Sequence, residues 1–190
     1  LESGILDTPE ESEDYTFQFA TNIPCPGTPT VEYEGQVYNT IQIFSQCWLK
    51  ENLNVGTMIP GSEYMSDNDT IEKYCYNNDT NNCNTYGGLY QWDEMMQYVI
   101  DSINQGICPQ GWLIPKYSDW FILKTFLGGT DSAGGKMKEV GNTHWMPPNT
   151  GATNESGFTG VGSGKRTEDG GSFQSLRSVL VWWTTDDIGD

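Results

Sequence analysis

The sequence predicts an α+β domain with two short helices, a small antiparallel sheet and long irregular loops. Residues 36–43 alternate apolar and polar side chains with the period of a strand that has one buried face. Apolar residues recur at three- and four-residue spacing in residues 89–99 and in 120–127, which is typical of short helices. The 22 glycines and the many Asn, Asp, Ser and Thr residues between these segments indicate loops.

The first half of the chain is expected to hold most of the sheet. A Pro-rich turn at 24–29 precedes the strand 36–43, and residues 47–49 form a second strand. From Gly61 to Gly88 the sequence predicts a long functional loop or a string of turns.

The second half is expected to begin with the helix 89–99, whose stripe of Leu89, Trp92, Met96 and Val99 packs in the core. The helix 120–127 ends at the pair Gly128-Gly129, which suits a helix C-terminus. Mostly loop follows up to Gly171, and residues 179–185 then form an apolar strand.

Composition and charge limit the class of protein. With nine Lys and Arg against 26 Asp and Glu, the chain carries a net charge of −17, which repels nucleic acid and anionic membrane surfaces. No stretch reaches the roughly 20 apolar residues that span a bilayer, so we expect no membrane insertion. We expect residues 1–22 to be an acidic leader or linker and residues 23–190 to be one domain. The start at Leu1 suggests a mature protein or a piece of a longer one.

The five cysteines indicate structural disulfides, because there is no CxxC pair and only one histidine. Structural disulfides imply an oxidising compartment and therefore export. Two pairs drawn from five cysteines allow 15 arrangements. Cys75 and Cys83 lie within local reach of each other, and a bridge from Cys25 to Cys47 would tie the entrance of the domain to its second strand. Cys108 is then unpaired.

Acidic loops offer a candidate metal site. Calcium prefers hard oxygen ligands on a loop, and Asp67, Asp69 and Asp79 are the best candidates for a structural calcium ion. Solvated turns whose Asx side chains bond their own backbone are the alternative. No other cofactor is expected.

Neither catalytic motif that we considered is complete. His144 is the single histidine, so a metal triad or a Ser-His-Asp device would depend on it alone. The glycines at 160–164 lack the GK[ST] order of a phosphate-binding loop.

Six blocks of sequence, taken in order, carry a family resemblance. They are VYNTIQI (37–43), QCWLKENLN (46–54), YGGLYQW (86–92), CPQGWLIP (108–115), GGKMK (134–138) and NTGATNESGF (149–158). In this order they resemble the Fibrobacter succinogenes major paralogous domain, over about Cys25 to Asp187. The resemblance implies a C-type lectin-like fold in an exported or surface-anchored protein of a Gram-negative bacterium, with no defined activity.

The chain departs from the family pattern at several positions. Phe44 stands where the family usually has Gly, and Lys116 stands where it has a Thr helix cap. The chain stops at Asp190, ahead of the family's final strands, so we expect the domain to lack them. The cysteine of those strands is, by the resemblance, the partner of Cys108. Proteins of this bacterial group also carry O-linked sugars at Asp-Ser/Thr-apolar motifs, which points to Thr70, Ser102 and Ser132, although such pairs are also ordinary turn formers.

The resemblance favours a non-catalytic recognition domain at the cell surface that binds a glycan or a surface protein. In this interpretation residues 61–84 and 146–171 carry the contacts, while residues 111–115 and Trp182-Trp183 are scaffold. The alternative is a structural or accessory subunit of a larger outer-membrane or extracellular assembly. A third is an enzyme of the formylglycine-generating type, but no cysteine has a His or basic neighbour in sequence.

Overall fold

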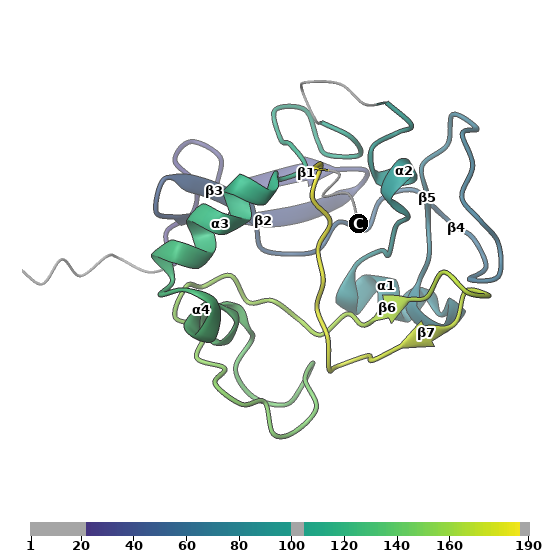
Figure 1. Ribbon diagram of the computed structural model, residues 1–190. Coiled ribbons are helices and arrows are strands. Elements are labelled where there is room, and N and C mark those ends of the chain that lie inside the picture. Colours follow the sequence, from purple (N-terminus) through teal and green to yellow (C-terminus); the bar gives the residue numbers. More distant parts are fainter. Residues whose placement is uncertain (1–21, 100–104, 187–190) are drawn as a thin grey trace, which may run out of the picture.

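The computed structural model describes residues 22–99 and 105–186 (Figure 1). Its largest sheet has three antiparallel strands in the order β1-β2-β3: β1 (Thr30–Tyr33), β2 (Gln36–Ile43) and β3 (Gln46–Leu49). The strand expected at 36–43 and the small antiparallel sheet are therefore confirmed. The single buried face is wrong, because β2 buries Tyr38 and Thr40 on one side of the sheet and Ile41 and Ile43 on the other.

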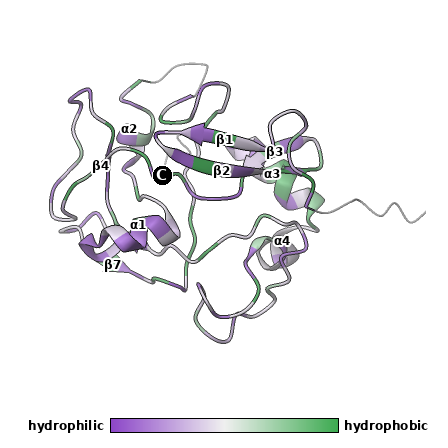
Figure 2. Cartoon of the chain, turned by 180° about the vertical axis from the view of Figure 1, so that it is seen from behind, coloured by the Kyte–Doolittle hydropathy of each residue, from purple (hydrophilic) through white to green (hydrophobic). Residues whose placement is uncertain are grey.

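Segments on both sides of the sheet explain this double burial. Ile41 and Ile43 pack in a core cluster with residues of two helices, namely Leu123 and Leu127, and Ala133 and Met137. On the opposite face, the hydroxyl of Tyr38 accepts a hydrogen bond from the backbone N–H of Asn54 at 3.1 Å. Figure 2 shows hydrophobic residues along β2 and hydrophilic ones along α1.

Four α-helices are present in the described residues, not two. They are α1 (Thr80–Tyr86), α2 (Trp92–Met95), α3 (Tyr117–Phe126) and α4 (Thr130–Met137), with a short 3₁₀ helix η1 (Tyr76–Asn78) before α1. The helix expected at 120–127 is confirmed as α3. The helix expected at 89–99 shrinks to α2, because Leu89 forms a β-bridge with Tyr74 and because Gln97 and Tyr98 have positive φ.

The two unexpected helices have little helix propensity of their own. α1 is entirely polar apart from Cys83 and Tyr86, and it begins at Asp79, whose side chain caps the backbone N–H of Asn81 at 2.9 Å. α4 contains Gly134 and Gly135, so the region after Gly129 was expected to be loop. Packing of Ala133 and Met137 against the core explains why this helix forms nonetheless.

The N-terminus of α3 has one of the two side-chain acceptors of a capping box. Lys116 occupies the N-cap position and offers no side-chain acceptor to the helix. Instead, the carboxylate of Asp119 accepts from the backbone N–H of Lys116 at 2.8 Å. The reach-back half of a capping box therefore remains.

Two further strand pairs organise the long loops. β4 (Thr57–Met58) pairs in parallel with β5 (Glu72–Lys73), and β6 (Lys165–Arg166) pairs antiparallel with β7 (Phe173–Gln174). The strand expected at 179–185 is wrong: this segment is extended, but it forms no strand with any described residue. It runs through the middle of the molecule, with α3 and α4 on one side and α1, α2 and β4 to β7 on the other (Figure 1).

Candidate functional site

Six of the seven tryptophans line one cleft of about 740 Å³. We call it the tryptophan cleft, and its indoles belong to Trp48, Trp92, Trp112, Trp120, Trp182 and Trp183. They come from β3, α2, the 111–115 segment, α3 and the final extended segment. Residues that are far apart in sequence therefore meet at one site.

Stacked rings build one end of the cleft. The ring centroids of Trp48 and Trp120 lie 4.7 Å apart, and those of Trp120 and Trp182 lie 4.9 Å apart in a stacked arrangement. Phe158 meets Trp182 edge-on at 5.4 Å. Such contacts add about 0.5–1.5 kcal/mol each beyond the burial of area, so this end is preorganised.

A second apolar cluster lines the deeper part. Met95, Ile107, Cys108 and Ile114 are all buried, and all four line the cleft. Cys108 is a free thiol, and burial raises its pKa to about 12. At neutral pH this thiol is protonated, so it contributes packing and not nucleophilic chemistry.

Residues 181–183 form one wall of the cleft. The indole N–H of Trp183 donates to the carbonyl of Tyr90 at 2.9 Å. The indole N–H of Trp92 donates to the carbonyl of Thr184 at 2.8 Å. Trp182 and Trp183 line the cleft and are 37% and 48% exposed, and their role as scaffold stays a prediction.

Several polar side chains that line the cleft have partners within the protein. Both carboxylate oxygens of Glu51 accept hydrogen bonds from Asn39, at 2.7 and 2.8 Å. The side-chain oxygen of Asn52 accepts from Trp182 at 3.2 Å, and that of Gln91 accepts from a tyrosine hydroxyl at 2.9 Å. These three side chains are engaged, whereas exposed Asp93, Lys165 and Glu168, which also line the cleft, make no side-chain hydrogen bond within the described residues.

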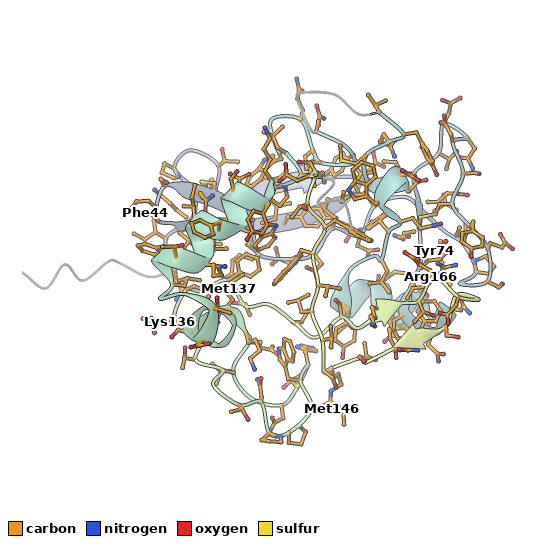
Figure 3. The ribbon with its side chains drawn as sticks, in the orientation of Figure 1. Phe44, Tyr74, Lys136, Met137, Met146 and Arg166 are labelled. Carbon is orange, nitrogen blue, oxygen red and sulfur yellow. A yellow bond between two sulfur atoms is a disulfide. The ribbon has the colours of Figure 1, made fainter. Side chains whose placement is uncertain are left out.

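The side chain of Arg166 also has its partners within the protein. Its Nε donates to the carbonyl of Gly61 at 2.8 Å, and its guanidinium lies 4.3 Å over the ring of Tyr74 and 5.3 Å from that of Tyr64. Figure 3 shows Tyr74 and Arg166 side by side next to β6 and β7. The arginine therefore fastens the loop after β4 to β6, and it is not a free cation of the cleft.

The sequence-predicted calcium ligands are not brought together. Asp67 and Asp69 are exposed in the loop between β4 and β5, whose backbone is bonded by Asn68 and Glu72 instead. Asp79 serves as the helix cap of α1. Within the described parts of the chain, no group of three His, Cys, Asp or Glu side chains could hold a metal ion. The calcium site stays a prediction.

Both expected disulfides are present. Cys25 is bonded to Cys47, with the two Cα atoms 5.7 Å apart, and Cys75 to Cys83, with 4.9 Å between them. The first links the entrance of the domain to β3, and the second links the residue before η1 to α1. No helix of the described residues is long and apolar enough to cross a membrane.

The candidate glycosylation residues differ in their surroundings. Thr70 is exposed in the loop before β5, where a sugar could be attached without steric conflict. Ser132 is half-buried in α4, and Ser102 lies outside the described residues. Glycosylation stays a prediction at all three positions.

A smaller cavity of about 440 Å³ lies on the α4 side of the wall. It is lined by Trp145, Met137 and the glycines of α4, together with residues 178–180 and Trp182. The ammonium of Lys138 lies 5.2 Å over the ring of Trp145. Trp182 is therefore common to both cavities.

The fold and the site define a small disulfide-linked α+β domain with a largely apolar cleft. Residues 41–190 match the Fibrobacter succinogenes major domain, and the chain belongs to this family. The family resemblance seen in the sequence is thereby confirmed. No curated protein and no solved structure matches the chain.

Sequence reasoning placed the contacts on loops and missed the cleft. Its residues lie in separate segments, and most have the apolar character that also predicts core. The available signal was compositional: seven tryptophans in 190 residues, several of them in the blocks that carry the family resemblance.

Proposed function

We propose that the protein is an exported, non-catalytic recognition domain with a C-type lectin-like fold that binds another polypeptide in the tryptophan cleft. The observation that carries this proposal is the chemistry of the cleft: stacked indoles over an apolar floor, with Glu51, Asn52 and Gln91 already engaged within the protein. Aromatic-lined apolar clefts of this kind are suited to apolar side chains of a partner. The two disulfides agree with an oxidising compartment.

A glycan is the second candidate ligand, and one observation favours it. Trp182 and Trp183 are the most exposed indoles of the cleft, and such rings can stack on sugar rings. A glycan would also need free hydrogen-bonding groups for its hydroxyls. Because Glu51, Asn52 and Gln91 are engaged within the protein, we place the polypeptide first.

As an accessory subunit of a larger surface assembly, the protein would use the same cleft. In that case the bound polypeptide is a permanent neighbour and not a transient ligand. The formylglycine-generating alternative requires a reactive cysteine pair, and four of the five cysteines are joined in disulfides in this structure. We therefore do not pursue it.

Two parallel screens test the proposal on the protein with its disulfides intact. A displayed library of random peptides and a glycan array, with and without chelator, are each screened with wild type, Trp183→Ala and Phe121→Ala. Phe121 is 50% exposed on α3 and does not line the cleft, so its variant is the matched control.

We expect peptides with apolar centres to be selected, Trp183→Ala to lose at least about tenfold in affinity, and Phe121→Ala to bind as wild type. Binding of glycans but not of peptides, with the binding lost in Trp183→Ala, would mean that the ligand of the cleft is a glycan and not a polypeptide. Loss of glycan binding on chelation would also support the calcium prediction. Peptide binding that is equal in all three proteins would remove the cleft from the proposal.

A further inference from the structure

The outer edge of β3 is open. Lys50 donates its backbone N–H to Asn39, so Lys50 is bonded inward, toward β2. Inward and outward residues alternate along an antiparallel strand, so Cys47 and Leu49 direct their N–H and C=O groups away from β2. Within the described residues, no backbone hydrogen bond reaches these groups from another segment. Such an edge is a template for one more strand.

This open edge borders the tryptophan cleft. Cys47, Trp48 and Leu49 all line it. Successive side chains of a strand point to opposite faces of its sheet, so a cavity over one face would touch only alternate residues. Contact with three consecutive residues means that the cleft runs along the edge of β3. A ligand in the cleft therefore has access to the unpaired backbone.

Unpartnered polar side-chain atoms lie at the same place. The indole nitrogens of Trp48 and Trp120 are buried donors without a hydrogen-bond partner, and the side-chain oxygen of Gln46 is a buried acceptor without one. Gln46 and Trp48 belong to β3, and Trp120 stacks on Trp48. An unpaired buried polar group costs about 1–3 kcal/mol. These atoms are fully covered in the free protein, so an extended backbone can pair with them only after the covering side chains move.

Charge indicates the flanks of the partner. The chain carries a net charge of −17, and the exposed charged residues that line the cleft are three acids, Glu51, Asp93 and Glu168, and one base, Lys165. A segment with Lys or Arg on either side of an apolar centre is attracted by this field, whereas an acidic one is repelled.

We infer that the partner polypeptide binds as an added strand on the outer edge of β3. This inference rests on the proposed function and specifies its binding mode. The backbone of the partner pairs with Cys47 and Leu49, its apolar side chains contact Trp48 and Trp120, and basic residues flank the paired segment. The main chain supplies affinity, and the indoles select the side chains that fit.

The test uses a soluble peptide of about eight alternating Val and Thr residues, an ordinary strand length, with lysines at both ends. Its matched control carries N-methyl groups on alternate amides, which remove the pairing donors and leave the side chains unchanged. On the protein side, Leu49→Pro removes an outward N–H that β2 does not use, and edge positions tolerate proline. Leu49→Val keeps that N–H and is the control.

Binding is measured by calorimetry, and amide hydrogen exchange is followed over residues 46–50. We expect the amides of Cys47 and Leu49 to become protected by the peptide. N-methylation and Leu49→Pro should each weaken binding at least about tenfold, and Leu49→Pro should weaken it far more than Leu49→Val, which changes the side chain but keeps the amide.

Two results would overturn strand addition and leave the proposed function standing. They are binding that is lost in Trp183→Ala but unchanged by N-methylation, and binding without protection of residues 46–50. If Leu49→Pro does not fold, the N-methylated peptide on wild type decides alone. No binding of the plain peptide would overturn the inference, and failure of the library screen as well would remove the proposed function.

Discussion

At the scale of single residues, Phe44 is a departure from the family pattern with a structural consequence. It lies in the turn between β2 and β3 with a φ of 55°, in the left-handed region that favours glycine. The family usually has glycine here, so the departure introduces strain. The ring of Phe44, which lies beside α3 in Figure 3, stacks on Phe126 at 5.0 Å, and this contact offsets part of the strain.

Two substitutions at Phe44 separate the strain from the ring contact. Phe44→Ala loses the ring and keeps a Cβ at positive φ, whereas Phe44→Gly loses both. We expect Phe44→Gly to be more stable than Phe44→Ala by about 1 kcal/mol in the free energy of unfolding, measured by urea denaturation. Equal stabilities would mean that the turn is not strained.

Cys108 should be nearly inert in the folded protein. With its pKa raised to about 12, the thiolate fraction at pH 8 is roughly a thousandfold below that of an ordinary cysteine. Iodoacetamide should therefore label it slowly in native protein and rapidly in urea.

Peptide mapping without reduction should recover Cys25 with Cys47 and Cys75 with Cys83. Fast native labelling, or Cys108 bonded to one of these four, would contradict this prediction.

At the scale of elements, the local sequence pattern predicted the strands and helices that pack directly against a neighbouring element. β2 was found because alternation marks Ile41 and Ile43, although the other face of the strand is buried as well, and α3 because its stripe includes the buried Leu123. The α4 helix was missed because packing overrides its two glycines. The apolar segment 179–185 was expected to be a strand, but its tryptophans bond to Tyr90 and Asn52 through side chains, not through a ladder.

The glycines of α4 provide a matched pair of variants. A Cβ at Gly135 would lie 2.2 Å from the backbone oxygen of Gly151, whereas a Cβ at Gly134 would meet nothing within 4 Å. Gly134→Ala should therefore stabilise the protein by up to about 1 kcal/mol through helix propensity. Gly135→Ala should destabilise it, because the loop at Gly151 must move. Thermal melting measures both, and a higher melting temperature for Gly135→Ala would contradict this packing.

At the scale of the whole molecule, the sequence predicted composition-level properties but not the site. Acidity, disulfides and the α+β class follow from counts and periods. The cleft depends on long-range neighbours, such as Trp48 and Trp120 from β3 and α3. Nothing local distinguishes a tryptophan of a cleft from one of the core. Only the family blocks, which contain Trp48, Trp92 and Trp112, marked some of these residues.

Buried tyrosines predict how stability changes at alkaline pH. Desolvation by burial raises the pKa of Tyr38, Tyr74 and Tyr90 above the usual 10.0. Unfolded tyrosines then lose their protons first, so the stabilisation is complete below pH 10 and declines as pH rises through the raised values. Desolvation lowers the pKa of Lys73 below its usual 10.5. Burying the charged lysine therefore destabilises the fold at lower pH, and this penalty disappears as pH rises toward 10.5.

Urea midpoints should therefore fall as pH is raised above about 10. Tyrosinate absorbance should rise together with the loss of circular dichroism, because the buried hydroxyls ionise on unfolding. Full tyrosine ionisation in a protein that keeps its native circular dichroism would contradict this assignment.

The shared wall between the two cavities has a thermodynamic consequence. Trp182 borders the tryptophan cleft on one side and the smaller cavity near α4 on the other. Any guest that pushes this indole aside enlarges one space by shrinking the other. Occupancy of the two spaces is then linked, and linkage in binding free energy is reciprocal. A small apolar probe in the cavity near α4 would report, through its own affinity, whether the cleft is filled.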